Sequence, residues 1–291
     1  MTFKTQKILL NGVRQQVYFW GSPRKPRLFL FHGWLDSAVS FHFLCEHLKK
    51  DFHCIGLDFR GYGKSDWSKN KLGYFFYEYV ADLKALFDTY SPKKPLNLLG
   101  HSFGGAVASI FAGAFPNRVK RFINLEGFTF RANPPELGPQ KLQEWLTSLS
   151  AHPQFRVFKT HADFAVRLQK NNPRLSKEKS LFLARHLVRR VAGGYKMSAD
   201  PLHKLAEPYL FNREILYAFW NNIQAKCLLV TGDQTEANLW MKSADFAKAL
   251  EERLDQFPKT SERVTLNNCS HMMHHEQPEK LAELIQEFLK E

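Results

Sequence analysis

Residues 96–114 read LNLLGHSFGGAVASIFAGA, and this stretch decides the fold. A short apolar run at 96–99 leads through GHSFG at 100–104 into a stretch suited to a helix at 106–114. A G-x-S-x-G sequence between a strand and a helix is typical of a sharp turn that exposes its serine as a nucleophile. Glycines on both sides of the serine let the crowded backbone pass without a Cβ clash. We therefore expect Ser102 to be a nucleophile at the end of a strand.

The residue after this serine adds a second chemical group. Phe103 would begin the helix, where backbone N–H groups have no partner within the helix and favour anions. Its amide could therefore stabilise an oxyanion that forms beside Ser102.

The composition describes an ordinary globular chain of 291 residues, with 44% hydrophobic and 24% charged residues and 26 Phe. The first residues lack the apolar core of a signal peptide, and no apolar run is long enough to span a membrane. Four scattered cysteines without metal-type spacing indicate reduced thiols. We expect a cytoplasmic protein without integral membrane association.

The chain carries a formal net charge of +13. Residues 128–222 contain 15 Lys and Arg against 7 Asp and Glu, so +8 of that charge lies in this segment. The cations are dispersed, which favours a solvated basic face and gives no sign of nucleic-acid binding. Attraction of acidic substrates or of a membrane surface is the alternative interpretation.

Short apolar runs alternate with stretches of helical length through most of the chain, which predicts a mostly parallel sheet with right-handed crossovers. Asn11-Gly12 indicates a hairpin between the first two strands. The predicted strands are Lys4 to Leu10, Arg14 to Trp20, Arg27 to Phe31, His53 to Leu57, Leu96 to Leu99, Arg121 to Leu125, Cys227 to Thr231 and Val264 to Leu266.

The pattern changes between residues 128 and 222. No convincing buried strand occurs there, and the segment is expected to be helical. The predicted helices are Pro139 to Leu149, His161 to Gln169, Lys177 to Val191 and Arg213 to Asn221. We expect a core of residues 1–127 and 223–291, interrupted by a helical cap of residues 128–222 that roofs the pocket.

Four motifs in order carry a family resemblance. They are His32-Gly33-Trp34, the run Asp58 to Ser65, the Gly100 to Gly104 turn, and His271 with Glu276-Gln277-Pro278. With these motifs the chain resembles the α/β-hydrolase-fold superfamily, in particular its cap-bearing serine hydrolases. The resemblance implies an α/β fold with a mostly parallel eight-stranded sheet flanked by helices and a helical cap after the sixth strand.

A serine hydroxyl needs a base within hydrogen-bond reach to act as a nucleophile. His271 fits best among the 12 histidines, because it lies between the last short strand and the final helix, where similar enzymes carry their base. Those enzymes commonly show G-H-x-x-x-x-E-x-P there, and this chain has Ser270 in place of the glycine.

The acid that would orient the base has two candidates. Many related enzymes carry it after the seventh strand, three residues beyond a glycine, but here that position holds Thr235, with Asp233 nearby. Haloalkane dehalogenases and some other cap-bearing members carry it after the sixth strand, where this chain has Glu126. We favour Glu126, with Asp233 as the alternative.

The resemblance implies a Ser102–His271–acid triad and an oxyanion hole formed by the backbone N–H groups of Trp34 and Phe103. The expected substrate is a small molecule with an apolar acyl part, cleaved at an ester or related bond without a cofactor or metal. Ser at position 102 argues against haloalkane dehalogenase or epoxide hydrolase chemistry, which uses an Asp nucleophile. Acyl transfer, a cofactor-free haloperoxidase-like activity and ligand binding without turnover remain alternatives, and the chain is expected to be a monomer or homodimer.

Overall fold

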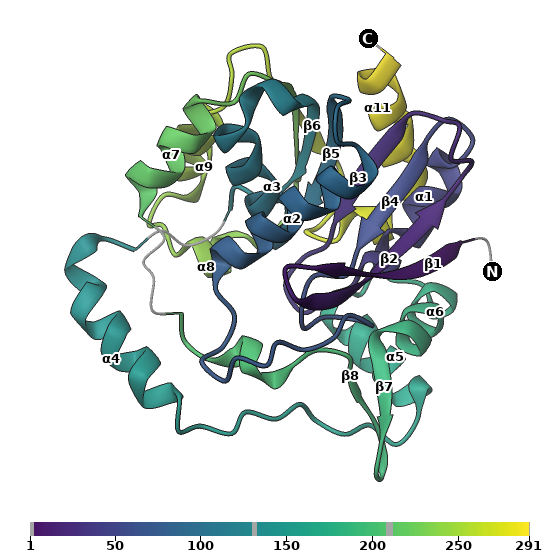
Figure 1. Cartoon of the computed structure of the whole chain (residues 1–291), viewed down its shortest axis with the longest axis vertical. Helices are drawn as coiled ribbons and strands as arrows, with labels where there is room; N and C mark the ends of the chain where they lie inside the picture. The colour runs from purple at the N-terminus through teal and green to yellow at the C-terminus, as the bar shows by residue number, and fades with distance from the viewer. Residues whose placement is uncertain (1–2, 130–132, 208–211, 291) are drawn as a thin grey trace.

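A computed structural model describes residues 3–129, 133–207 and 212–290. Its main sheet has eight strands in the order β1-β2-β4-β3-β5-β6-β9-β10 (Figure 1). The strands are β1 (Lys4–Leu10), β2 (Val13–Trp20), β3 (Arg27–Phe31), β4 (His53–Leu57), β5 (Leu96–His101), β6 (Val119–Leu125), β9 (Lys226–Gly232) and β10 (Glu262–Leu266). All eight predicted strands are confirmed, and three of them have the predicted bounds.

The sheet is antiparallel only at its N-terminal edge. β1 and β2 form a hairpin closed at Asn11 and Gly12, both with positive φ, and β2 runs antiparallel to β4. Every other neighbouring pair in this sheet is parallel. The carboxyl ends of β3, β5, β6, β9 and β10 therefore meet at one edge, which is where open α/β sheets place their sites.

Helices cover both faces of the sheet (Figure 1). On one face α1 (His42–Leu48) packs against α11 (Pro278–Lys290). On the other face α3 (Phe103–Ala114) packs between α2 (Phe76–Tyr90) and α7 (Arg213–Asn221). The α/β architecture predicted from the alternating pattern is confirmed.

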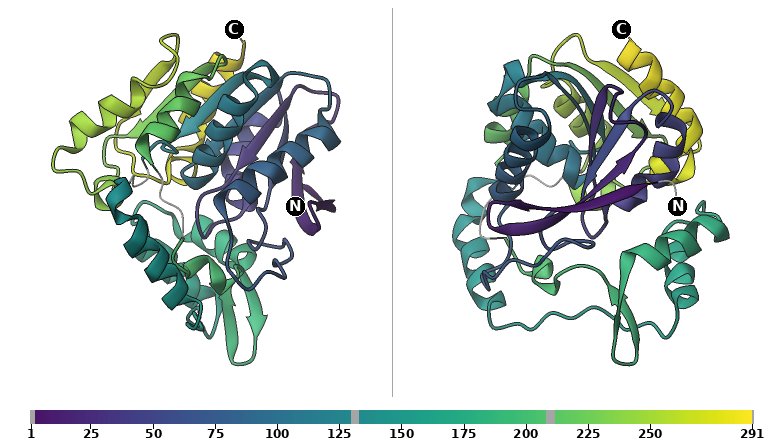
Figure 2. Two further views of the ribbon diagram at one scale, coloured as in Figure 1. Left: turned by 60° about the vertical axis from the view of Figure 1, so that its left-hand side comes forward. Right: turned by 45° about the vertical axis from the view of Figure 1, so that its right-hand side comes forward.

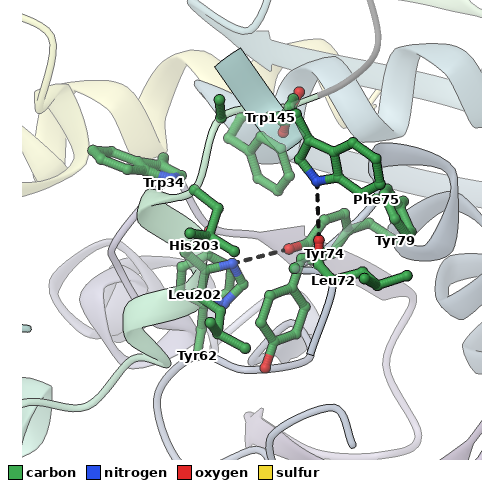
Figure 3. Close-up of a pocket in the computed structure, with 14 residues that line it drawn as sticks. Trp34, Tyr62, Leu72, Tyr74, Phe75, Tyr79, Trp145, Leu202 and His203 are labelled. Carbon is green, nitrogen blue, oxygen red and sulfur yellow. Dashed lines mark hydrogen bonds between the residues drawn. The ribbon is translucent and has the colours of Figure 1, made fainter. Parts of the chain in front are cut away.

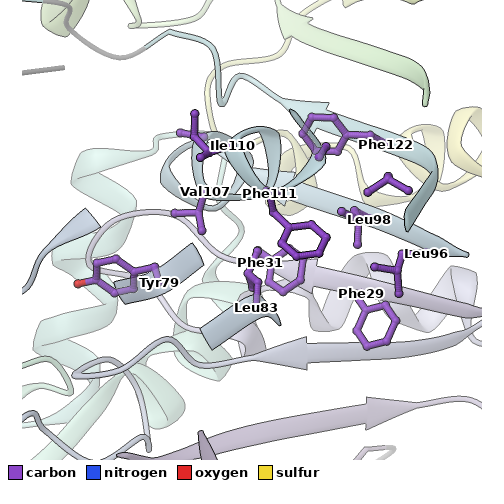
Figure 4. Close-up of a cluster of buried hydrophobic side chains, with 14 of the residues drawn as sticks. Phe29, Phe31, Tyr79, Leu83, Leu96, Leu98, Val107, Ile110, Phe111 and Phe122 are labelled. Atoms are coloured by element: carbon purple, nitrogen blue, oxygen red, sulfur yellow. The ribbon is translucent and has the colours of Figure 1, made fainter. Parts of the chain in front are cut away.

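Two buried clusters follow from this layering. Figure 4 shows the cluster on the α2 and α3 side, where Phe29 and Phe31 of β3 meet Phe111 of α3. The second cluster joins α1 and α11, through Leu44 and Ile285 among others, to the opposite face. Because the parallel strands are covered on both faces, nearly every side chain in β3, β4 and β9 is buried, as their apolar sequences require.

The segment between β6 and β9 lies mostly beyond one end of the sheet (Figure 2). It contains α4 (Gly138–Ser148), α5 (His161–Asn171) and α6 (Lys177–Leu187). It also contains an antiparallel hairpin of β7 (Val188–Val191) and β8 (Gly194–Met197). The cap expected from the sequence is thus helical in the main but not entirely.

The helix predicted over Lys177 to Val191 was too long, because it ends at Leu187 and the last residues form β7. Gly193 and Gly194 both have positive φ and close the hairpin, and Val188 to Val191 pairs residue by residue with β8. The strands are mostly exposed or half-buried, so they lack the apolar run by which a buried strand is recognised.

Residues 199–205 fix this segment to the core. Tyr74 Oη donates to Asp200 Oδ2 at 2.8 Å, and Asp200 N donates to the carbonyl of Gly61 at 2.8 Å. The His203 ring lies stacked between the rings of Tyr62 and Tyr74, with centroid distances of 3.8 and 3.9 Å. This contact brings the segment's 201–207 stretch close to the carboxyl edge of the sheet.

Three short helices complete the core, namely α8 (Asn238–Met241), α9 (Phe246–Leu254) and α10 (Met273–Glu276). The four cysteines are buried, unpaired thiols. Among the helices of the described ranges, none has the length and hydrophobicity to cross a bilayer.

Candidate active site

Ser102 lies at the turn between β5 and α3, at the carboxyl edge of the sheet. Its φ of 50° and ψ of −119° are rare for a residue with a side chain, and such strain concentrates at functional sites. The backbone holds this conformation, because Ser102 N donates to the carbonyl of Leu125 at 2.8 Å and Ser102 O accepts from Ala106 N at 3.0 Å. The turn presents the half-buried serine to a cavity.

The two glycines of the turn are sterically required. A Cβ on Gly100 would lie 2.5 Å from the Cα of Gly105, and one on Gly104 would lie 2.2 Å from the carbonyl oxygen of Phe31. Both distances are far below contact, so α3 can approach β3 and β5 only with glycine at these positions. This is the packing reason that the sequence pattern anticipated.

The His271 imidazole lies beside the Glu126 carboxylate. His271 Nδ1 and Glu126 Oε2 are 2.6 Å apart, a length typical of a charge-assisted hydrogen bond. Because the carboxylate can only accept, Nδ1 carries the proton and Nε2 is left to face the cavity that also contains Ser102. No hydrogen bond joins Ser102 Oγ to His271 among the described residues; such contacts often tighten only with substrate bound.

Glu126 is a buried carboxylate with a full set of donors. It directly follows β6 with a φ of 54°, and only 1% of its surface is exposed. Gly232 N donates to Oε1 at 2.8 Å, and the Thr235 hydroxyl donates to Oε2 at 2.7 Å, besides the contact from His271. An unpaired carboxylate in this place would cost much free energy, and these three donors offset that cost.

Asp233 lies at the same edge of the sheet, but its carboxylate accepts hydrogen bonds from the backbone. Its side chain is exposed, and Oδ1 accepts from Cys269 N at 3.0 Å. Hydrogen bonds from the Cys269 and Asn268 backbone hold its pKa below the usual value. This carboxylate therefore caps the loop that leads to His271, while Glu126 contacts the imidazole itself.

The loop before α10 is fixed by Glu276. Its carboxylate accepts from Ser270 N at 2.9 Å and from the Ser270 hydroxyl. Arg174 of the cap segment lies 3.9 Å from the same carboxylate. The serine that replaces the usual glycine thus adds a hydrogen bond that helps to position His271.

The loop after β3 brings Trp34 to the site. Phe59 N donates to His32 Nε2 at 3.0 Å, so the proton of this ring is on Nδ1, which donates to the carbonyl of Gly33 at 2.7 Å. Burial lowers the pKa of His32 to about 4, which keeps the ring neutral. These bonds fix the backbone that leads to Trp34, and Phe103 N begins α3 on the other side of Ser102.

Ser102 and His271 open into a cavity of about 490 Å³. Its walls are mostly apolar and include four large aromatic side chains, Trp34, Phe76, Phe103 and Trp240. The Trp240 ring packs edge-on to the His271 ring with centroids 4.8 Å apart. A volume of this size suits a small or medium-sized ligand.

Several of these wall residues were missed by the sequence analysis. Phe76 lies at the start of α2 and Trp240 in α8, and neither belongs to a motif that the sequence analysis identified. Among the aromatic residues of segment 128–222, Trp145 lines a smaller neighbouring cavity, and Trp220 of α7 packs against α3 with its Nε1 donating to Ser109 at 2.9 Å. Phe130 lies outside the described residues. Asp36 and Glu207, which also line the main cavity, carry no motif that would have identified them.

One group within the described ranges has the composition of a metal site. Ligand atoms of Asp36, His274 and His275 lie within 4.8 Å of one another, and burial lowers the pKa of His275 to about 3. The Ser40 hydroxyl already donates to Asp36 at 2.8 Å. None of these three belongs to the Ser102–His271–Glu126 set.

The fold and the site together define a hydrolase of the α/β class, with a serine on the turn after the fifth strand. The chain belongs to the family described as having the alpha/beta hydrolase fold, which matches residues 26–278. The resemblance stated from the four motifs is thereby confirmed.

The relatives point the same way. The chain is 26% identical over 287 residues to human serine hydrolase-like protein 2, covering 93% of this chain and 89% of that protein. It is 29% identical over 113 residues to mouse epoxide hydrolase 4, covering 39% and 31% of the two chains. These similarities support hydrolase activity.

A solved structure shows the same fold. The thioesterase domain from the curacin biosynthetic pathway superposes with a TM-score of 0.86 at 24% identity, over 98% of this chain and 100% of that one. At this identity the likeness concerns the fold alone.

Proposed function

We propose that the protein is a serine hydrolase that cleaves an ester or related acyl bond of a small molecule through Ser102, His271 and Glu126. The observation that carries the proposal is the buried Glu126 carboxylate 2.6 Å from His271 Nδ1, with Ser102 on the wall of the same cavity. Residues 128–222 act as the cap that closes this cavity.

The hydrogen bond from Nδ1 to Glu126 fixes the tautomer in which Nε2 can accept a proton. His271 takes the proton of the Ser102 hydroxyl as its oxygen attacks the acyl carbon. The backbone N–H groups of Trp34 and Phe103 stabilise the oxyanion. His271 then protonates the leaving alcohol, and water attacks the acyl-enzyme with His271 again as the base.

The donors around Glu126 explain why it suits this role. Gly232 N and Thr235 Oγ1 donate hydrogen bonds to the buried carboxylate, which lies where it can stabilise the imidazolium that forms during the reaction. A buried carboxylate needs such donors, and these two satisfy it besides His271.

The serine also separates this proposal from epoxide opening. An enzyme that opens an epoxide through an ester intermediate needs a carboxylate nucleophile, and position 102 carries a hydroxyl. The partial similarity to an epoxide hydrolase therefore follows from the shared fold.

The test is hydrolysis of p-nitrophenyl esters with acyl chains of two to twelve carbons, with labelling by a fluorophosphonate probe. We expect both activities in the wild type and neither in Ser102→Ala, with Ser243→Ala, an exposed serine, as the matched control. Full turnover in Ser102→Ala would overturn the proposal. Labelling without turnover would indicate a binding protein, and transfer to an added alcohol faster than to water would indicate an acyltransferase.

A further inference from the structure

The charges of the catalytic cavity differ in sign from the charge of the chain. The chain has a net charge of +13, yet the described residues that line the 490 Å³ cavity include Asp36, Glu126 and Glu207 and no Lys or Arg. Clefts lined by one sign of charge focus the potential and select ligands of the opposite sign. The Lys and Arg residues lie elsewhere, so a substrate meets carboxyl groups and no Lys or Arg among the described residues of this cavity.

The three carboxylates are not equivalent. Glu126 is compensated by His271, Thr235 and Gly232, and Asp36 accepts a hydrogen bond from Ser40. Glu207 has neither a hydrogen bond nor an ion pair with another described residue. A carboxylate in an apolar cavity without a partner costs free energy, and such a group is a candidate for ligand binding.

Glu207 lies between two cavities. It follows the 201–204 turn that docks on the core, and it lines both the catalytic cavity and a neighbouring one. The neighbouring cavity has a free volume of only about 20 Å³, because the rings of Tyr62, Tyr79 and Trp145 fill it (Figure 3). Of these two cavities, only the catalytic one has room for a substrate group to reach Glu207.

The aromatic side chains of the catalytic cavity can also bind a positive charge. Trp34, Phe103 and Trp240 line the catalytic cavity, and aromatic faces attract ammonium groups most strongly where water is displaced. Burial raises the pKa of the Glu207 carboxyl to about 7, and a nearby cation would restore its charge.

We propose that Glu207 binds a protonated amine on the substrate, so that the natural substrate is an amine-bearing ester. This inference rests on the proposed function, since it concerns the same cavity. The amine could belong to the acyl part, as in an amino acid ester, or to the alcohol part, as in an amino alcohol ester. Both place an ammonium beside a cleavable ester bond, and the test separates them.

The test compares esters of matched shape that carry an ammonium, a neutral methyl or a carboxylate at the same position. One series carries the group on the acyl part and the other on the alcohol part. In the wild type we expect kcat/KM to fall from the cationic to the neutral to the anionic ester, by about tenfold at each step in one of the two series. Glu207→Gln should reduce the preference for the cationic over the neutral ester to about twofold.

Glu214→Gln serves as the control, because Glu214 is exposed on α7 and lies outside the cavity. Hydrolysis of the neutral ester that depends on Ser102, without any cationic preference, would overturn the inference and leave the proposed function standing. A preference that survives Glu207→Gln would overturn the assignment to this residue.

A binding measurement covers the case in which Glu207→Gln does not fold or no ester is turned over. Calorimetry on the wild type with hexylamine at pH 7.5, compared with hexanol and hexanoate, tests the charge preference without catalysis. We expect the amine to bind about tenfold more tightly than the alcohol. Equal or weaker binding of the amine would contradict the inference whatever the outcome of the ester assays.

Discussion

β6 and β9 are neighbours in the sheet, and an acidic residue follows the carboxyl end of each strand. One of these residues is buried and the other is exposed. Leu125 pairs with Val230 in register, so the two segments that follow these strands leave the sheet next to each other. Beyond β6, Glu126 is buried and contacts His271. Beyond β9, Asp233 is exposed and caps a loop.

Many related enzymes carry the acid at the position that Thr235 occupies here, and the Thr235 side chain still contacts the site. Its hydroxyl donates to the same Glu126 oxygen that contacts His271. Two adjacent strand ends can therefore reach one imidazole, and the acid can occupy either of them. The residue at the other strand end then donates a hydrogen bond to the carboxylate, as Thr235 does here.

We expect the largest effect from moving the acid from the end of β6 to the end of β9. Glu126→Gln should lower kcat/KM by about 10⁴-fold, as removal of the acid does in other triads. Adding Thr235→Asp should restore roughly 10- to 100-fold of that loss, because the new carboxylate would lie beside the amide at 126 and within reach of His271. Steady-state ester hydrolysis measures both steps, and no recovery in the double variant would show that the two strand ends are not interchangeable.

A smaller effect concerns the support that Thr235 gives. Thr235→Val removes the hydroxyl donor to Glu126, and a hydrogen bond to a charged group contributes about 1.5–3 kcal/mol, so we expect kcat to fall by about 10- to 150-fold. Thr235→Ser keeps the donor and should remain within about twofold of the wild type. An unchanged kcat in Thr235→Val would mean that Glu126 needs no support from β9.

The role of Asp233 is expected to show in stability. Asp233→Asn weakens the acceptor for Cys269 N, and so the loop before His271 should loosen and the melting temperature should fall slightly. Thermal unfolding of this variant beside Glu287→Gln, an exposed acid on α11 whose side chain has no hydrogen bond or ion pair to another described residue, measures the difference. A melting temperature equal to that of the control would leave the capping role without support.

A further effect distinguishes Glu126, whose carboxylate has hydrogen-bond donors, from Glu207, which has none among the described residues. Burial raises the pKa of Glu207 from 4.5 to about 7, so between these pH values the folded protein holds more protons than the unfolded chain. Stability contributed by Glu207 therefore falls as pH rises from about 4.5 to about 7. The melting temperature of Glu207→Gln, relative to wild type, should rise over this interval, and a constant difference would contradict the shift.

Much of this arrangement was predictable from the sequence. The first two strands followed from alternation on either side of Asn11-Gly12 and the other six from short apolar runs. The turn at Ser102 followed from glycines whose Cβ positions are blocked by backbone. Both signals are local, since they depend on residues close together in the chain. The short hairpin of β7 and β8 lacks such a signal because its side chains are not buried in an apolar layer.

The contacts across the site were harder to predict, because they join residues far apart in the chain. The sequence placed Glu126 and Asp233 as alternatives, and only the register of β6 with β9 brings the Thr235 hydroxyl onto Glu126. The cavity walls were missed for the same reason. Phe76, Trp240 and Glu207 come from three separate segments that meet only in the folded chain.

The most direct test of the account compares kcat/KM for ester hydrolysis in Glu126→Gln and Asp233→Asn under identical conditions, with folding of each variant checked by circular dichroism. The account predicts a loss of about 10⁴-fold in Glu126→Gln and a value within about threefold of wild type in Asp233→Asn. The reverse order, with Asp233→Asn inactive and Glu126→Gln active, would contradict it.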